Sequence, residues 1–372
     1  MDKAKSKDAV RIGVIGCGNI SAIYLKNLGI FRNTKVISVA DLDMGRARAR
    51  AKEFNIPAVC TVKQMLADPD VEVVLNITIP KAHYQVSMAA LNAGKHLYSE
   101  KPLAIVRKDG EKILKTALAR KLLLGCAPDT FMGAGLQTCR KVIEDGVIGQ
   151  PIGAAAFMMY HGAESWHPDP EFLYETGGGP ILDMGGYYLN AFISLIGPVK
   201  AVHASHRATF PERLITSLPK RGKRLKVEVS THVAAVLEFQ TGAIATLVAS
   251  FDVWAHTMPN IQIYGTEGSM TCPDPNTFGG PVLVQRSTDK KWKEVRLKHS
   301  YAENSRGLGL ADMARSLRTG RPYRATGLMA YHALETMTSI LDSGDLGKSI
   351  PIRSTCARPK PLPIGLKKGE ID

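Results

Sequence analysis

Two glycines near the N-terminus stand where a chain could hold a phosphate group. Gly16 and Gly18 follow the apolar run RIGVI and precede a stretch of helical character. Gly16 allows a tight turn, and Gly18 lets the backbone approach a pyrophosphate at the positive end of the next helix. Asn19 and Ile20, which follow the glycines, are expected to contact the cofactor as well. A lone glycine motif has low specificity, and here Ser21 stands where a third glycine or alanine would complete it. The prediction of a dinucleotide site therefore depends on the surrounding elements.

A carboxylate at the end of the next strand-like run indicates which dinucleotide would bind. The run KVISVA ends at Asp41, about 20 residues after Gly18. A carboxylate at this spacing binds the adenosine ribose hydroxyls of NAD and repels the 2′-phosphate of NADP. Arg46 and Arg48 lie nearby and keep NADP open as the less favoured cofactor. The alternative interpretation is a structural strand–helix–strand turn with an incidental aspartate.

The elements around these residues alternate between strand and helix up to about Cys126. Five β-rich runs (RIGVIG, KVISVA, VEVVLNIT, KHLYSE and KLLLGC) are separated by stretches of helical character, of which 44–54 and 83–94 are the clearest. Such alternation predicts a parallel sheet covered by helices on both faces. We therefore expect an α/β protein whose N-terminal domain, residues 1–130, is a doubly wound Rossmann fold.

The pattern changes after about Gly149. The runs 231–240, 242–254 and 260–272 predict neighbouring strands joined by short turns, and helical segments follow near 307–319 and 326–343. We expect residues 131–352 to form a second α/β domain with a large open sheet that is mixed and mainly antiparallel. The Pro- and Lys-rich tail, 353–372, is expected to wrap the surface or to be disordered.

The composition limits the class of protein. The chain has 372 residues, of which 45% are hydrophobic and 22% charged, as in ordinary soluble proteins. No apolar run reaches the roughly 18 residues of a membrane span, and the polar N-terminus does not resemble a signal peptide, so we expect a cytoplasmic protein without a membrane partner. The net charge is +14. The densest cluster of basic residues comprises Arg213, Lys220, Arg221, Lys223, Arg224 and Lys226. No aromatic residues are interleaved with it, which favours a solvated basic loop over a nucleic-acid site. The alternative is that this loop binds an anionic partner.

The cysteines show no sign of a metal site. None of the six stands in a C-x-x-C pair, so we expect buried free thiols and no bound metal.

Two further segments carry a family resemblance. They are IPKAHYQVSMAALNAGKHLYSEKPLA, residues 79–104, and GGGPILDMGGYYLNAF, residues 177–192. With the glycine turn they resemble the glucose–fructose oxidoreductase and inositol dehydrogenase family (Gfo/Idh/MocA), from Arg11 to about Ile352. The resemblance implies an Lys-Pro peptide that is commonly cis, with the lysine at the nicotinamide. It also implies that the C-terminal sheet supports a homodimer or homotetramer. The cofactor-binding residues it implies beyond the glycine turn are Ile79, Pro80, His83, Glu100, Lys101 and Pro102.

The resemblance also implies the catalytic residues. The family's D-x-G-x-H motif maps onto Asp183 to Tyr187, so a tyrosine stands at the usual histidine position, as in some sugar and dihydrodiol oxidoreductases of the family. A tyrosine hydroxyl ordinarily has a pKa near 10, and a nearby lysine ammonium favours the phenolate. We therefore expect Lys101 beside Tyr187, with Asp183 binding a substrate hydroxyl or completing a proton relay. Which of Lys101 and Tyr187 is the immediate base stays open.

Three more residues are candidates for binding substrate. Asp129 follows a strand-like run at the place where family members often carry an Asn-x-Arg element, so it could contact cofactor or substrate, or be a turn residue. In the loop 161–179, Trp166 could stack on a sugar ring and His167 could bind a hydroxyl. The alternative for both is packing within the loop.

These residues together predict an NAD-dependent oxidoreductase that acts on a secondary hydroxyl of a small carbohydrate or cyclitol. Two alternatives remain. One is a glycosidase that keeps NAD bound and uses transient oxidation. The other is a dinucleotide-sensing regulator that retains the fold without the chemistry.

Overall fold

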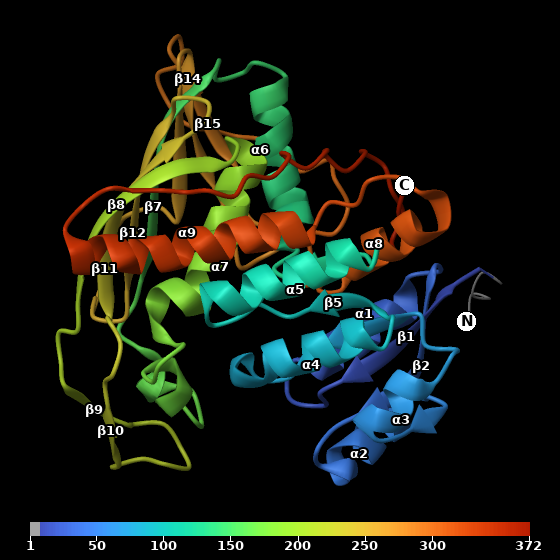
Figure 1. The fold of residues 1–372 in the computed structure, drawn as a ribbon. Coiled ribbons are helices and arrows are strands. Elements are labelled where there is room, and N and C mark those ends of the chain that lie inside the picture. The colour runs from blue at the N-terminus through green and yellow to red at the C-terminus, as the bar shows by residue number, and fades with distance from the viewer. Residues whose placement is uncertain (1–7) are drawn as a thin grey trace.

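The computed structural model describes residues 8–372, in which two β-sheets lie side by side with helices packed against them (Figure 1). The first sheet is parallel throughout, with the strand order β3-β2-β1-β4-β5-β6. This confirms the predicted Rossmann sheet. Its strands are β1 (Val10–Ile15), β2 (Thr34–Ala40), β3 (Ala58–Val59), β4 (Val73–Asn76), β5 (His96–Ser99) and β6 (Leu124–Cys126).

Local sequence signals determine where several helices of this part begin. The Asp43 side chain accepts hydrogen bonds from the first turn of α2, and Thr61 with Gln64 forms a capping box at α3. Pro80 lies in the first turn of α4, where its missing N–H costs nothing. The helices are α1 (Ser21–Ile30), α2 (Met44–Phe54), α3 (Val62–Ala67), α4 (Pro80–Asn92) and α5 (Arg107–Ala119).

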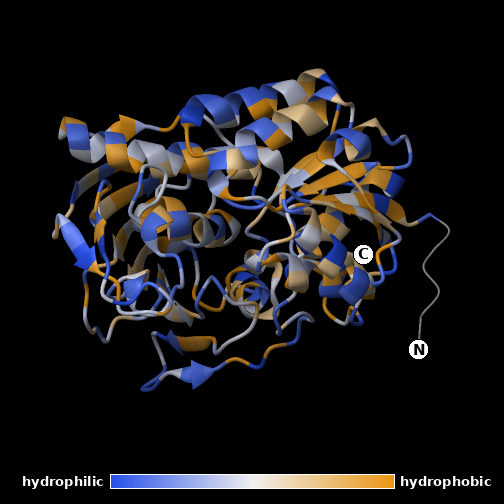
Figure 2. Cartoon of the chain, turned by 90° about the horizontal axis from the view of Figure 1, so that it is seen from below, coloured by the Kyte–Doolittle hydropathy of each residue, from blue (hydrophilic) through white to orange (hydrophobic). Residues whose placement is uncertain are grey.

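The strand order reverses between β1 and β4, which identifies where a ligand should bind. Connections from β1 proceed to one side of the sheet and those from β4 to the other, and in open α/β sheets ligands bind at the carboxyl ends of the strands where the order reverses. The strands themselves are buried on both faces, as the fully buried VVLN of β4 shows. Figure 2 shows the hydrophobic residues concentrated in the interior strands and the outer loops mostly hydrophilic.

The second sheet has nine strands in the order β16-β15-β14-β13-β7-β12-β11-β8-β17. All neighbours are antiparallel except β7 and β12, which are parallel. The mixed, mainly antiparallel sheet is confirmed. Its strands are β7 (Pro151–Met159), β8 (Val199–Arg207), β11 (His232–Phe239), β12 (Ile244–Ser250), β13 (Ile261–Gly265), β14 (Gly268–Cys272), β15 (Leu283–Arg286), β16 (Lys293–Glu294) and β17 (Ile350–Pro351). A separate hairpin comprises β9 (Glu212–Leu214) and β10 (Arg224–Lys226).

One expected strand pairing is wrong. β11 and β12 are neighbours as predicted, but β12 and β13 are separated by β7, and the run 260–272 contains two paired strands, β13 and β14. The connection 251–260 is long enough to cross over a strand, and β7 carries alanines in place of the β-branched residues that favour strands. The sequence pattern therefore gave little indication that another strand lies between them.

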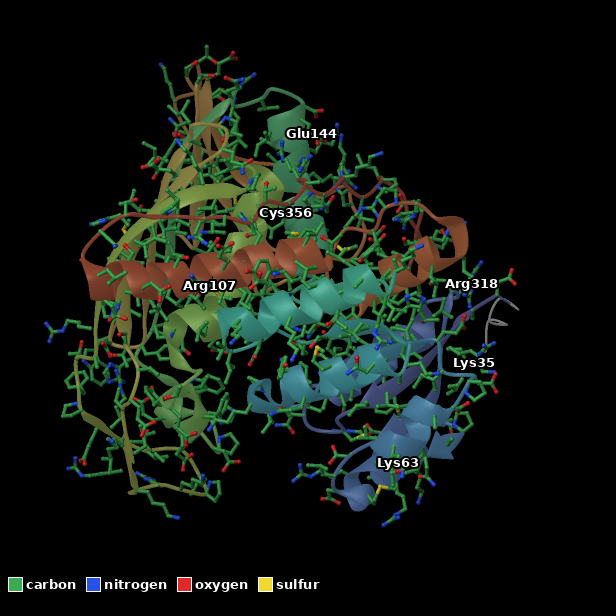
Figure 3. The ribbon with its side chains drawn as sticks, in the orientation of Figure 1. Lys35, Lys63, Arg107, Glu144, Arg318 and Cys356 are labelled. Carbon is green, nitrogen blue, oxygen red and sulfur yellow. The ribbon has the colours of Figure 1, made fainter. Side chains whose placement is uncertain are left out.

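Three helices pack on the second sheet, and one helix returns to the first. α7 contacts α9, and α9 contacts β8 and also α5, where Arg107 Nε donates to Thr338 Oγ1 at 2.9 Å (Figure 3). In contrast, α8 packs on β6 and α1, and its Arg318 pairs with Glu72 at 2.8 Å. These helices are α6 (Ala134–Glu144), α7 (Gly179–Leu195), α8 (Leu308–Thr319) and α9 (Gly327–Leu346), with short 3-10 turns η1 (Thr130–Met132), η2 (Ala163–Ser165) and η3 (Glu171–Leu173).

The tail after β17 crosses the surface back towards the first sheet (Figure 1). Its Leu362 N–H donates to Gln137 Oε1 at 2.7 Å, and Arg32 N–H donates to the Gly369 carbonyl at 3.4 Å. Asp372 pairs with Arg324 at 2.9 Å. The tail thus ties the end of α1 to the second part of the chain.

The sequence also predicted buried free thiols and no membrane-spanning segment. All six cysteines are free, and five are buried. Within residues 8–372, no helix combines the length and the apolarity that crossing a membrane requires.

Candidate active site

The glycine turn after β1 has the geometry that a dinucleotide requires. Gly16 has a φ of +105°, and a Cβ there would lie 2.6 Å from the carbonyl oxygen of Ile77, so only glycine fits. A Cβ on Gly18 would meet nothing within 4 Å, which leaves open space beside the turn. No side chain caps the first turn of α1, and its Ser21 N–H donates to the Gly18 carbonyl at 3.1 Å, so the N–H groups that follow in this turn remain available to a phosphate.

Ser21 and Asp41 complete the turn in ways the sequence did not show. The Ser21 hydroxyl, fully buried, donates to the Gly18 carbonyl at 2.5 Å and accepts from Arg50 Nε at 3.0 Å. Ser21 thus stabilises the turn despite replacing the third glycine. The Asp41 carboxylate accepts from Cys17 N–H at 2.7 Å, which fixes it beside the turn where a ribose would lie.

The residues predicted after β4 include the exposed Ile79 and the buried His83. Ile79 is 67% exposed and offers an apolar surface next to Pro80 at the start of α4. His83 is fully buried, and its two ring nitrogens lie 2.7 Å from the Pro102 carbonyl oxygen and 3.0 Å from that of Thr78. Burial lowers its pKa. His83 therefore links the turns after β4 and β5.

The Glu100–Lys101–Pro102 segment follows β5 and lies next to α1. Glu100 Oε1 accepts from the Tyr24 hydroxyl at 2.7 Å, and Oε2 accepts from Lys101 N–H at 2.8 Å. The Lys101–Pro102 peptide is cis, as the resemblance implied. The carboxyl end of β5 and the helix after the glycine turn therefore meet at Glu100.

Lys101, Asp183 and Tyr187 come together across the two parts of the chain. Lys101 Nζ donates to the Asp183 carbonyl at 2.7 Å and to Asp183 Oδ1 at 2.8 Å, and it lies 5.3 Å from the centroid of the Tyr187 ring. Burial by itself lowers the pKa of Lys101, but the charges of Asp183, Tyr187 and Glu100 and the hydrogen bond to Asp183 raise it above its usual value. Lys101 is therefore a cation at neutral pH.

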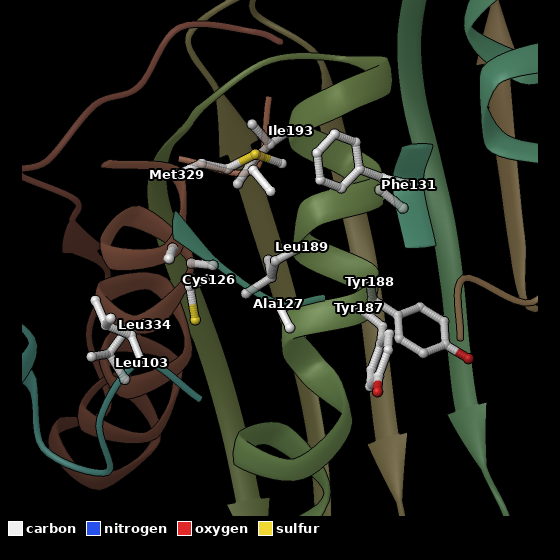
Figure 4. Close-up of a cluster of buried hydrophobic side chains, with 14 of the residues drawn as sticks. Leu103, Cys126, Ala127, Phe131, Tyr187, Tyr188, Leu189, Ile193, Met329 and Leu334 are labelled. Atoms are coloured by element: carbon white, nitrogen blue, oxygen red, sulfur yellow. The ribbon is translucent and has the colours of Figure 1, made fainter. Parts of the chain in front are cut away.

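Helix α7 positions two of these three residues. Asp183 and Tyr187 are four residues apart and share one face of the helix. The same helix is buried along nearly its whole length, and Figure 4 shows its Leu189 and Ile193 in a cluster with residues of β6 and α9, while the Tyr187 and Tyr188 rings lie at the end of the cluster. The cluster fixes α7, so the Asp183 and Tyr187 side chains project from a rigid element.

Asp129 is held by the backbone of α8. Its Oδ2 accepts from Gly307 N–H at 3.0 Å and Gly309 N–H at 2.8 Å, and the residue is 1% exposed. Burial raises its pKa to about 6, although those N–H groups and Arg306 act in the opposite direction. The structure thus shows Asp129 at the N-terminus of α8 with no direct path to solvent, and contact with a ligand stays a prediction.

Trp166 and His167 lie in the loop after β7 and contact each other. Trp166 is 61% exposed and packs edge-on against His167, which packs against Phe172. No hydrogen bond or ring contact joins either of them to Lys101 or Tyr187 within the described residues. Their predicted role in binding substrate remains a prediction.

One residue of the basic cluster is not solvated, contrary to expectation. The Arg213 side chain is 3% exposed, pairs with Glu164 at 2.7 Å and with Asp252, and lies against the Tyr174 ring. Two carboxylates and two aromatic rings surround the guanidinium, which offsets its loss of water. Composition could not separate Arg213 from its exposed neighbours such as Arg224, whose side chain is 70% exposed.

Sequence reasoning missed Arg306, which also contacts the site. Its Nη2 lies 3.5 Å from the Tyr187 hydroxyl. The residue belongs to no motif, and the two positions are 119 residues apart, so no pattern in the chain could connect them.

The fold and this site define the class of protein. A Rossmann sheet with a glycine turn, followed by a second domain that carries Asp183 and Tyr187 to Lys101, is the arrangement of an NAD-binding oxidoreductase. Residues 10–127 match the oxidoreductase family with an NAD-binding Rossmann fold, and residues 136–271 match the GFO/IDH/MocA C-terminal domain. The chain belongs to the Gfo/Idh/MocA oxidoreductase family.

Individual relatives cover most of the chain. 1,5-Anhydro-D-fructose reductase from Ensifer adhaerens is 30% identical over 312 residues, which span 82% of this chain and 84% of the relative. Myo-inositol 2-dehydrogenase from Thermotoga maritima is 23% identical over 86% of this chain and 91% of its own. Among solved structures, levoglucosan dehydrogenase in complex with NADH and levoglucosan has a TM-score of 0.80 at 20% identity, covering 93% of this chain and 100% of that one. An NAD-binding oxidoreductase from Klebsiella pneumoniae has the same TM-score at 19% identity, covering 93% and 99%.

Proposed function

We propose that the protein transfers a hydride between a secondary hydroxyl of a sugar, glycoside or cyclitol and the nicotinamide of NAD. The observation that carries the proposal is the contact of Lys101 with Asp183 and Tyr187 next to the dinucleotide turn. Relatives named for 1,5-anhydro-D-fructose, myo-inositol and levoglucosan support the choice of a polyhydroxylated ring. NAD, when bound, would accept or return the hydride.

Lys101, Tyr187 and Asp183 each have a different role in this proposal. An ammonium group has three N–H donors, and Lys101 uses two on Asp183, so the third is free for a substrate oxygen. A cation at that oxygen stabilises negative charge as the proton leaves. Because Lys101 holds its own proton tightly, we assign the proton transfer to the Tyr187 hydroxyl. Asp183 keeps Lys101 charged and in place.

The test uses the purified protein with NAD and myo-inositol or levoglucosan, and with NADH and 1,5-anhydro-D-fructose. We expect NADH absorbance to change with at least one probe, and Lys101→Met to lower kcat by about 10² or more while NADH binding, followed by fluorescence, persists. Lys115→Met, an exposed lysine on α5, is the matched control and should behave as the wild type. No hydride transfer in either direction would refute the proposal.

The same assays separate the alternatives. Free sugar released from a glycoside without net NADH would indicate a glycosidase that oxidises its substrate transiently. Tight NADH binding with no turnover, unaffected by Lys101→Met, would indicate a regulator.

We also propose that the exposed face of the second sheet forms a homodimer. Three apolar side chains lie on that face, as the register of adjacent strands shows. These are Val236 at 41%, Ile244 at 55% and Tyr264 at 37% exposure. Such a patch favours association with another surface. Ile244→Glu should convert the protein to monomers in sedimentation velocity, and an unchanged mass would contradict the proposal.

A further inference from the structure

Arg306 brings a second cation to Tyr187 from the segment before α8. Its Nη2 lies 3.5 Å from the Tyr187 hydroxyl oxygen, while Lys101 Nζ lies 5.3 Å from the centroid of the same ring. The phenol therefore has a positive group at its ring and another at its oxygen. Of the two cations, only Arg306 is in hydrogen-bonding contact with the Tyr187 hydroxyl oxygen, which is the atom that would exchange a proton.

The two cations differ in how their charge is balanced. Lys101 is paired with Asp183 at 2.8 Å. Arg306 instead contacts neutral oxygens. Its Nη2 donates to Asn276 Oδ1 at 2.6 Å and its Nη1 to Asn304 Oδ1 at 3.0 Å, and no carboxylate of the described residues pairs with it. Its charge thus remains available to act on the Tyr187 oxygen.

The backbone of this segment is tied down from two sides. Asn27 Nδ2, on α1, donates to the Arg306 carbonyl at 2.9 Å. On the other side, Asp129 Oδ2 accepts from Gly307 N–H at 3.0 Å. These bonds fix the position of the guanidinium with respect to both the dinucleotide helix and the carboxyl end of β6. The contact with Tyr187 is therefore preorganised by the fold.

The chemistry of the guanidinium determines what the contact does. Arginine has N–H donors and no acceptor, so the Tyr187 oxygen must accept at this contact and its own proton must point elsewhere. We propose that Arg306 is a positioning residue that acts through Tyr187, and that it orients the hydroxyl and stabilises negative charge on its oxygen. This inference rests on the proposed function.

The proton balance is simple. In carbonyl reduction the Tyr187 O–H bond breaks, the proton goes to the substrate oxygen, and the electron pair remains on the Tyr187 oxygen facing Arg306. The hydride comes from NADH. In alcohol oxidation the Tyr187 oxygen takes the proton of the substrate hydroxyl, and the hydride goes to NAD.

The test is a double-mutant cycle of Arg306→Gln and Tyr187→Phe, assayed with NAD and myo-inositol or levoglucosan. We expect Arg306→Gln to lower kcat by about 10- to 100-fold, with KM changed by less than about 3-fold, as for the loss of one donor to a developing oxyanion. In the Tyr187→Phe background the same substitution should change kcat by less than about 3-fold. Arg306→Lys should restore part of the rate, because it returns the charge. Arg315→Gln, an exposed arginine on α8, is the control and should leave kcat unchanged.

Two kinetic outcomes would overturn the inference. Equal losses in both backgrounds would show that Arg306 does not act through Tyr187. A rise in KM with an unchanged kcat would show that it binds substrate instead.

A readout without turnover separates this inference from the proposed function. If the wild type transfers no hydride with myo-inositol, levoglucosan or 1,5-anhydro-D-fructose, the proposed function fails by itself. The contact is then tested by the same cycle in urea unfolding, where the effects of the two substitutions should be non-additive. Additive effects on unfolding would overturn the contact as well.

Discussion

The ion pair between Lys101 and Asp183 should contribute to stability as well as to chemistry. Its 2.8 Å contact corresponds to about 6 kcal/mol of attraction at an effective dielectric constant of about 20, and to about 1.5 kcal/mol in water. The side chains are 19% and 23% exposed, so part of this is screened and part offsets desolvation. Asparagine keeps an oxygen acceptor but not the charge. We therefore expect Asp183→Asn to lower the free energy of unfolding by about 1 to 3 kcal/mol at pH 7.

The measurement is urea unfolding of the wild type and of Asp183→Asn. Asp145→Asn is a matched control, because Lys141 and Asp145 are also 2.8 Å apart but are 41% and 49% exposed, so the loss should stay below about 0.5 kcal/mol. The pKa of Lys101 is raised in the folded state, so its contribution is full below its unfolded pKa, near 10.5, and is lost only as the pH rises through the folded value. The loss should thus be constant from about pH 7 to 9. A loss no larger than that of Asp145→Asn, or a gain in stability, would refute the reasoning.

Three further comparisons of variants test other parts of the structure. Gly16→Ala should weaken both folding and NADH binding because of its positive φ, whereas Gly18→Ala, with open space around its Cβ, should weaken only NADH binding, as fluorescence titration and urea unfolding would show. Arg213→Ala should cost about 3 to 5 kcal/mol in urea unfolding because it leaves buried carboxylates unpaired, and Arg224→Ala less than about 0.5; equal costs would contradict the burial of Arg213. The pKa of Asp129 is about 6 in the folded state against an ordinary 3.8, so its stabilising contribution is full below about pH 4 and is lost as the pH rises through 6. The difference in unfolding free energy between the wild type and Asp129→Asn should therefore shrink by about 3 kcal/mol from pH 4 to 7, and a constant difference would contradict the shift.

The elements that sequence could predict are those with local causes. Asp43 caps α2, and the glycine turn and Asp41 meet because neighbouring parallel strands end at one edge of the sheet. The proximity of Lys101 to Tyr187 was expected from the resemblance, whereas nothing in the spacing indicates the hydrogen bond from Lys101 to Asp183, 82 residues away.

The elements that escaped prediction depend on long-range packing. β7 enters between β12 and β13, and its alanines fit there because its neighbours supply the bulk, which no local pattern reports. Arg213 resembles its basic neighbours in sequence, but its burial depends on Glu164 and Asp252, which other segments bring. In both cases, the feature is determined by residues or strands that are distant in the sequence and adjacent only in the folded protein.

The position of α8 explains why the site includes an arginine that no motif contains. The chain leaves the first sheet after β6, builds the second sheet, and then returns with α8 onto β6 and α1. This return places Arg306 at the boundary, where its side chain reaches Tyr187 of the second part while its backbone is held by Asn27 and Asp129 of the first. A change in the relative position of the two parts would separate Arg306 from Tyr187 as well as Lys101 from Asp183. The contacts of Tyr187 with Arg306 and with Lys101 therefore depend on the same placement of the two parts, which gives a physical reason for proton transfer to require that placement.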